Sequence, residues 1–141
     1  MQTDWRPTAS LTTLHKRAAL LAQLRAFFAA RAVLEVDTPA LMPTTATDLY
    51  IDSFCLNPAA ASSEGLGSGD QSQLYLQTSP EFPLKRLLAA GSGAIYQLGK
   101  VFRNEQSSPQ HSREFTMLEW YRPGFTLEQL MDEVEFLVNE V

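Results

Sequence analysis

Charged and aromatic side chains alternate through the stretch FRNEQSSPQHSREFTMLEWY. Side chains two apart share a face of a strand, so Phe115, Glu119 and Tyr121 are expected to point to the same side. If the segment that ends in FRNE pairs with this strand antiparallel, Arg103 and Glu105 join that face. One surface would then gather a cation, two carboxylates, a phenol and an aromatic ring.

Burying these charges without partners costs several kcal/mol each, so they must pair with one another, reach water or meet a ligand. Cross-strand pairs of arginine and glutamate are common in sheets, and mutual pairing therefore stays open. The polar loop QSSPQHS, which carries His111, is placed to fold over the same face. Donors and a planar aromatic around a cationic centre suit a nucleoside triphosphate, which makes a nucleotide site the second interpretation.

Helical patterns precede and follow this stretch. Apolar spacing predicts a long amphipathic helix over 12–32, with Thr12 or Thr13 as its N-cap. A second helix is expected over 78–91, where Thr78 and Glu81 have the spacing of a capping box. Pro80 in its first turn and Gly91 at its end fit the same interpretation.

A final helix is expected to begin at Thr126, with Gln129 completing a capping box. Its five acids and absence of bases indicate a solvated face. Its apolar face comprises Leu127, Leu130, Met131, Val134, Leu137 and Val141.

Short strands are expected between the helices, in addition to the two strands of the charged stretch. They fall at residues 33–36, 48–56 and 74–77. The segment 57–73 is small, polar and rich in Gly and Ser, which indicates a flexible connection.

The composition is that of an ordinary soluble globular protein, with 141 residues, 45% hydrophobic and 19% charged. Eleven basic against 16 acidic residues give a net charge of -5, so no basic surface indicates nucleic acid. The single cysteine, Cys55, fits a buried small side chain in a reducing cytoplasm. No charged leader with an apolar run and no membrane-length apolar segment is present, so we expect neither secretion nor membrane insertion.

The charged stretch resembles motif 2 of the class II aminoacyl-tRNA synthetases, an aromatic-Arg-x-Glu followed by a loop and a basic-residue, Phe and Glu pattern. RAVLEVDTPALM resembles motif 1 of these enzymes, with Pro39 as its proline. TSPEFPLKRL is similar to the lysyl branch. TDLYIDSF and FTMLEWYRP are most similar to a group of lysyl-tRNA synthetase paralogues that lack the anticodon-binding domain and attach (R)-β-lysine to elongation factor P.

The resemblance implies an α+β fold, an antiparallel sheet flanked by helices of the class II synthetase catalytic-domain type. Residues 1–141 would be the N-terminal portion of that domain. It also implies a homodimer joined through the first helix and the strand before Pro39.

Roles for individual residues follow from the same resemblance. Arg103 would bind the α-phosphate of ATP and the substrate carboxylate, and together with Glu105 it is the predicted catalytic pair. Phe115 would stack on adenine and His111 would lie near the phosphates. The full set implied to bind ATP is Arg103, Asn104, Glu105, His111, Ser112 and Phe115.

The implied substrate is lysine or β-lysine, whose two ammonium groups call for carboxylates. Ser79, Pro80 and Glu81 would hold its amino end. Glu119 and Tyr121 would meet the ammonium of its side chain.

The implied reaction has two steps, activation of the substrate carboxylate by ATP and transfer of the acyl group to an acceptor amine or hydroxyl. The expected acceptor is a lysine of elongation factor P, favoured by the acidic balance and by the lack of an N-terminal nucleic-acid-binding domain. Transfer to tRNA-Lys is the alternative. Mg²⁺ is expected to bridge the phosphates, with its ligands in acids beyond Val141 and no metal ligand within the chain.

The chain departs from the family pattern in three places. Ser112 stands where an asparagine is usual, and Ala32 stands where a glycine is common. Motif 3, with its second ATP-binding arginine, is absent. We therefore expect little or no turnover from the chain alone, and an inactive dimerisation module is the competing function.

Overall fold

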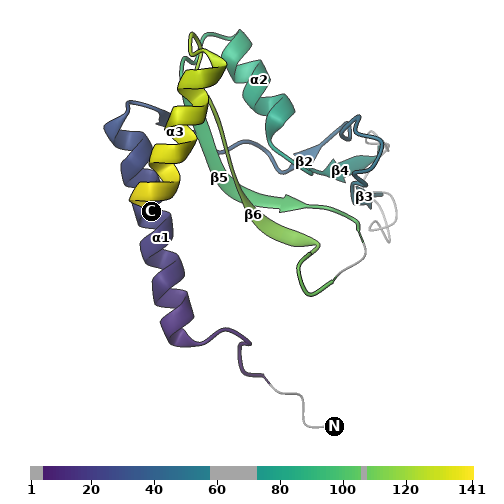
Figure 1. The fold of residues 1–141 in the computed structure, drawn as a ribbon. Coiled ribbons are helices and arrows are strands. Elements are labelled where there is room, and N and C mark those ends of the chain that lie inside the picture. Colours follow the sequence, from purple (N-terminus) through teal and green to yellow (C-terminus); the bar gives the residue numbers. More distant parts are fainter. Residues whose placement is uncertain (1–4, 58–72, 106–107) are drawn as a thin grey trace. The chain divides into compact units, whose positions relative to one another are not determined.

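A computed structural model describes residues 5–57, 73–105 and 108–141 (Figure 1). The chain divides into two compact units, one made of Met1–Leu34 with Arg122–Val141 and the other of Glu35–Tyr121. The predicted flexible connection over 57–73 lies outside the described residues except for its two ends.

The first unit contains α1 (Leu11–Ala30), which begins at a different cap from the one expected. The hydroxyl of Ser10 accepts a hydrogen bond from the backbone N–H of Thr13, at 3.1 Å. The prediction of Thr12 or Thr13 as the N-cap was wrong, because Ser10 already has the extended backbone and the acceptor that a cap requires. Most of the helix surface is exposed, and burial is concentrated at Phe27 and Phe28.

The end of α1 shows why Ala32 is unusual. The N–H groups of Ala32 and Val33 bond to the carbonyls of Ala29 and Phe28, the double hydrogen bond of a Schellman motif. Ala32 has a φ of 54°, a left-handed conformation that costs a residue with a Cβ roughly 1–2 kcal/mol. The departure from glycine thus falls at a position where the backbone favours glycine.

The last helix, α3 (Leu127–Glu140), has the capping box that the sequence predicts. Thr126 Oγ1 accepts from the Gln129 backbone at 3.3 Å, and Gln129 Oε1 accepts from the Thr126 backbone at 2.8 Å. The assignment of all its acids to a solvated face was wrong for Glu133. That side chain is buried and its carboxylate lies 3.3 Å from Arg122 Nε, so its charge is compensated inside the unit.

The predicted apolar face of α3 is largely exposed within the described residues. Leu137 is buried, whereas Leu127, Met131 and Val134 are exposed. The helical pattern was therefore predicted correctly, but burial of this face was not observed.

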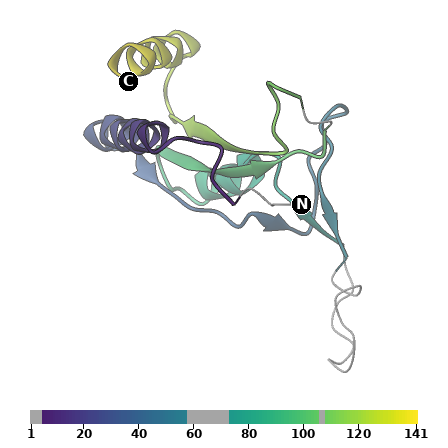
Figure 2. The same ribbon diagram turned by 90° about the horizontal axis from the view of Figure 1, so that it is seen from below.

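The second unit is built on a long antiparallel hairpin of β5 (Ile95–Phe102) and β6 (Glu114–Tyr121). The two strands run side by side in both views (Figures 1 and 2). β1 (Leu34–Glu35), at the boundary of the two units, gives the sheet the order β1-β5-β6. The hairpin confirms both strands predicted for the charged stretch.

A second sheet of the same unit has the order β2-β4-β3, with β2 (Leu41–Met42), β3 (Cys55–Leu56) and β4 (Leu74–Leu76). Both pairings are antiparallel. The strand predicted over 48–56 was wrong except for its last two residues. Leu49 and Tyr50 are 90% and 92% exposed, so their alternation has no apolar partner to pack against. Cys55 is exposed, which contradicts its expected burial.

Helix α2 (Glu81–Ala89) follows β4 and packs against β5. The predicted capping box does not form, because Pro80 is the N-cap and has no side-chain acceptor. The hydroxyl of Ser79 instead accepts from the Glu81 backbone at 3.3 Å. Gly91, with a φ of 86°, ends the helix as predicted. Antiparallel strands and a packed helix confirm the α+β prediction.

Candidate functional site

The register of the hairpin fixes which side chains share a face. Phe115 lies opposite Val101, and Glu119 lies opposite Gln97. Because residues two apart in a strand point to the same side, Tyr121 shares the face of Phe115 and Glu119. The predicted shared face is confirmed for Phe115, Glu119 and Tyr121.

Arg103 lies just beyond β5, where its backbone N–H bonds to the carbonyl of Arg113 at 2.9 Å. Its guanidinium carbon is 5.3 Å from the centre of the Phe115 ring. Its Nε donates a long hydrogen bond of 3.5 Å to the carbonyl of Thr78, the residue before Ser79. Arg103 therefore connects the end of the hairpin with the segment that opens α2.

A cavity of about 340 Å³ opens beside Arg103. The structure brings together in its lining most of the residues expected to bind a nucleotide. The lining residues are Arg103, Glu105, Gln110, His111, Ser112 and Phe115. Asn104 is not among them. It is exposed, and its backbone N–H bonds to the carbonyl of Asp52 at 2.8 Å.

A tight turn presents His111 to this cavity. Ser108 and His111 exchange two backbone hydrogen bonds of 3.1 Å. A third hydrogen bond of 2.8 Å joins the hydroxyl of Ser108 to Nδ1 of His111. The imidazole is thus oriented by its own loop before any ligand arrives.

A second cavity, of about 170 Å³, lies at the start of α2. Ser79 and Glu81 line it, as does Thr78. The other wall of this cavity is rich in hydroxyl groups and was not predicted from the sequence. That wall is formed by Thr44, Thr45, Thr47, Asp48 and Ser53. The run PTTATD could have indicated it by composition, but no periodicity assigns such a run to a site.

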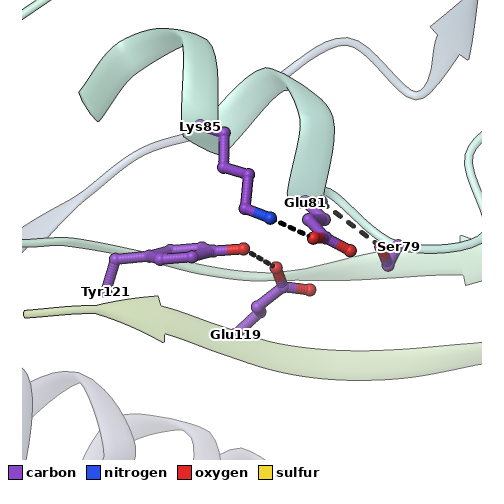
Figure 3. Close-up of polar contacts among 5 residues, drawn as sticks. All are labelled: Ser79, Glu81, Lys85, Glu119 and Tyr121. Atoms are coloured by element: carbon purple, nitrogen blue, oxygen red, sulfur yellow. Dashed lines mark hydrogen bonds and ion pairs between the residues drawn. The ribbon is translucent and has the colours of Figure 1, made fainter. Parts of the chain in front are cut away.

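Glu81 and Lys85 of α2 and Glu119 and Tyr121 of β6 form an acidic cluster (Figure 3). Figure 3 shows the carboxylates of Glu81 and Glu119 directed toward one another from the helix and the strand. Tyr121 donates its hydroxyl to Glu119 Oε1 at 2.8 Å, and Lys85 Nζ pairs with Glu81 Oε1. Lys85 was missed from sequence, although its spacing of four from Glu81 on a helix could have indicated the pair.

Burial raises the pKa of Glu119 above its ordinary value. The Tyr121 hydrogen bond opposes this shift, whereas the nearby Glu81 carboxylate adds to it. Burial and the bond to Glu119 likewise raise the pKa of the Tyr121 phenol. Glu119 is therefore a half-buried carboxylate whose negative charge the fold compensates incompletely.

Mutual pairing of the charges on this face, the alternative left open by the sequence, is wrong. Within the described residues, the ion pairs include none formed by Arg103, Glu105 or Glu119. Arg103 and Glu105 line the first cavity, whereas Glu119 lies in the acidic cluster with Glu81, so the cation and the two carboxylates do not neutralise one another.

Two further predicted residues contribute differently. Pro80 is fully buried as the N-cap of α2, so it supports the position of Ser79 and Glu81. Pro39 is exposed, and its role in a dimer stays a prediction. In the described part of the chain, no three His, Cys, Asp or Glu side chains gather as metal ligands.

The fold and the site define the class of protein. The chain belongs to the class II tRNA synthetases (D, K and N), a family that matches residues 2–141. No helix among the described residues is long and apolar enough to span a membrane.

Curated relatives narrow the comparison. The chain is 54% identical over 139 residues to the elongation factor P–(R)-β-lysine ligase of Vibrio vulnificus, covering 99% of the chain and 42% of the relative. It is 54% identical over 138 residues to the ligase of that name from Vibrio cholerae, and 51% identical over 138 residues to that from Yersinia enterocolitica. Both alignments cover 98% of the chain and 41% of the relative. The chain thus spans about two fifths of the length of these relatives.

Proposed function

We propose that the protein carrying this chain uses ATP to activate (R)-β-lysine or lysine and transfers the acyl group to a lysine of elongation factor P. Three observations support this: the family, the names of the relatives and the charge pattern of the site. The reaction belongs in the cytoplasm, where both ATP and the translation factor are present.

The position of Arg103 is the main structural support for this proposal. Its side chain lines the larger cavity, and its Nε reaches the carbonyl of Thr78 in the lining of the smaller one. A guanidinium at this junction can hold a phosphate on one side and a carboxylate on the other. These are the two groups that react: a carboxylate oxygen bonds to the α-phosphorus and pyrophosphate leaves. The acceptor amine then takes the acyl group and releases AMP.

The residues around Arg103 fit a nucleotide. Phe115 offers a ring face for a base, and His111 and Ser112 offer polar groups at the cavity wall. Catalysis by this arrangement would be alignment of the two reactants and compensation of negative charge on the phosphate. Mg²⁺, when bound, would add positive charge at the phosphates.

The acidic cluster fits the other reactant. A half-buried Glu119 with a raised pKa is a carboxylate that an ammonium group would stabilise in its charged form. Ser79 and Glu81 stand at the smaller cavity to receive the second amino group. A diamino acid would thus place its carboxylate toward Arg103 and its amines toward Glu81 and Glu119.

Exchange of labelled pyrophosphate into ATP tests the proposal on the protein that carries this chain. We expect exchange that depends on (R)-β-lysine or lysine, followed by label transfer to elongation factor P. Exchange with transfer to tRNA-Lys would overturn the acceptor. Failure of exchange, together with failure of the protein to bind lysine, would leave the dimerisation module as the function. Sedimentation of the chain checks the proposed homodimer separately.

A further inference from the structure

We propose that Lys85 is a resident competitor for Glu81: its ammonium group occupies Glu81 in the empty site and is replaced there by an amino group of the substrate. This inference rests on the proposed function, because it concerns the same amino-acid site. It makes Lys85 a specificity-determining residue.

The geometry provides the starting point. Lys85 Nζ pairs with Glu81 Oε1 across one turn of α2, and Figure 3 shows the lysine chain directed toward the carboxylate. Glu81 also lines the smaller cavity and faces Glu119 of β6. The group that Lys85 holds is therefore a group that the proposed substrate needs.

An ordinary helix-stabilising pair with this spacing would lie on a surface facing solvent. The Glu81–Lys85 pair is exposed as well, and it differs from an ordinary pair because the carboxylate of Glu119 faces Glu81. The charge of Lys85 acts on Glu119 as well, since it opposes the rise in the pKa of that carboxyl. Lys85 thus compensates part of the negative charge of the whole cluster.

Charge balance indicates that Lys85 leaves when a diamino acid binds. Glu81 and Glu119 bring two negative charges and Lys85 one positive charge, which leaves the empty cluster with a net charge of -1. A diamino acid whose carboxylate is held by Arg103 brings two ammonium groups. With Lys85 still present the cluster would be positive, whereas without it the charges cancel.

The lysine side chain is free to move. The side chains of Lys85 and Glu81 are 57% and 42% exposed, and Lys85 can extend into water when its place is taken. Exposed pairs of this kind change binding equilibria by roughly two- to five-fold. Displacement of Lys85 should therefore lower substrate affinity by a factor in this range.

The replacement of Lys85 by a substrate amine also affects how strongly the site discriminates between ligands with and without that amine. A ligand that lacks the amino group at Glu81 leaves the Glu81–Lys85 pair intact and exposes no unpaired carboxylate. Lys85 therefore reduces the penalty for a missing amine, and its removal should increase that penalty.

The test compares lysine with 6-aminohexanoate, which keeps the terminal ammonium and lacks the second amine, by calorimetric titration of the protein that carries this chain. In Lys85→Met we expect lysine to bind roughly two- to five-fold more tightly and 6-aminohexanoate to gain clearly less, because only lysine takes the place of Lys85 at Glu81. Lys85→Arg keeps the cation and should restore wild-type affinity for lysine. Arg86→Met is the matched control, because it removes a like charge from the next residue of α2, which is exposed.

Equal shifts for both ligands, or weaker binding of lysine by Lys85→Met, would overturn the inference. Unchanged binding of lysine would do the same. Glu119→Gln tests the proposed function separately. Both ligands carry the terminal ammonium, so both should bind this variant more weakly whether or not Lys85 is displaced. If the wild-type protein that carries this chain binds neither ligand, the proposed function and this inference are both overturned.

Discussion

The two faces of the β5–β6 hairpin treat charge in opposite ways. On one face, Lys100 and Glu114 form an ion pair of 2.8 Å, and both side chains are 54% exposed. On the other face, Arg103 and Glu119 are partly buried, and neither forms an ion pair with any described residue. The same strands thus carry one compensated pair and one pair of separated, uncompensated charges.

This difference separates structural from functional charge. An exposed cross-strand pair satisfies itself in solvent and contributes little to stability. Arg103 and Glu119 form hydrogen bonds with neutral groups, the carbonyl of Thr78 and the hydroxyl of Tyr121. A partly buried charge without an opposite charge beside it is a cost that folding alone does not explain. We infer that the face with Arg103 and Glu119 has its charges compensated by ligands of opposite sign, an anion at Arg103 and a cation at Glu119.

We expect the removal of Arg103 to have the largest effect on activity. Arg103→Ala deletes the cation at the junction of the two cavities, so we expect amino-acid-dependent pyrophosphate exchange to fall about 100-fold or more. The decrease should appear in kcat/KM for both ATP and the amino acid. A variant that retains wild-type exchange would show that Arg103 does not contact the reacting groups.

Glu119→Gln should come next in magnitude. The amide keeps the size of the side chain and removes the charge, so lysine should bind roughly 10- to 100-fold more weakly. Burial raises the pKa of Glu119, which means that the fold favours its protonated form. Stability contributed by this group is therefore present at low pH and lost as the pH rises through the raised pKa, so the variant should not lower the free energy of unfolding at neutral pH. Reduced stability with unchanged lysine affinity would assign Glu119 a structural role.

The same pKa shift predicts a pH dependence of binding. An ammonium ligand requires ionised Glu119, so lysine affinity should fall as the pH decreases through a pKa that lies above the ordinary 4.5. Glu119→Gln should abolish this part of the profile. A profile identical in the two proteins would exclude Glu119 from contact with the ligand.

A smaller effect is expected at the nucleotide cavity. Ser112 lines it where the family pattern has asparagine, and Ser112→Asn adds a longer donor and acceptor. We expect ATP to bind about 2- to 10-fold more tightly while lysine affinity stays constant. If the variant alters the affinity for lysine and not that for ATP, Ser112 does not contact the nucleotide.

The smallest effect is expected on the opposite face. Lys100→Met breaks the pair with Glu114 and should lower the free energy of unfolding by about 1 kcal/mol at most. Affinities for ATP and lysine should not change. If Lys100→Met lowers the affinity for either ligand as strongly as Glu119→Gln does, the two faces do not differ in function.

The hairpin was predictable because strand alternation assigns faces without knowledge of the rest of the chain. Phe115, Glu119 and Tyr121 share a side by alternation, and the antiparallel register brings Arg103 to it. The family resemblance then supplied their roles, which remain predictions.

Other features depend on contacts that local patterns do not contain. Leu49 and Tyr50 alternate as strand residues do, yet the pairing partners of β4 lie elsewhere. Thr78 and Glu81 have capping-box spacing, but the chain enters the helix at Pro80 and Ser79 provides the acceptor. Lys85 and the hydroxyl-rich wall belong to the site because tertiary structure brings α2, β6 and the segment before β3 together.

A structure of the protein with lysine and a non-hydrolysable ATP analogue would show which ligand groups the charges of the hairpin bind. We expect the terminal ammonium at Glu119 and Tyr121, the carboxylate and α-phosphate at Arg103, and Lys85 turned away from Glu81. Ligands bound on another surface, or an amino acid oriented with its carboxylate toward Glu119, would contradict it.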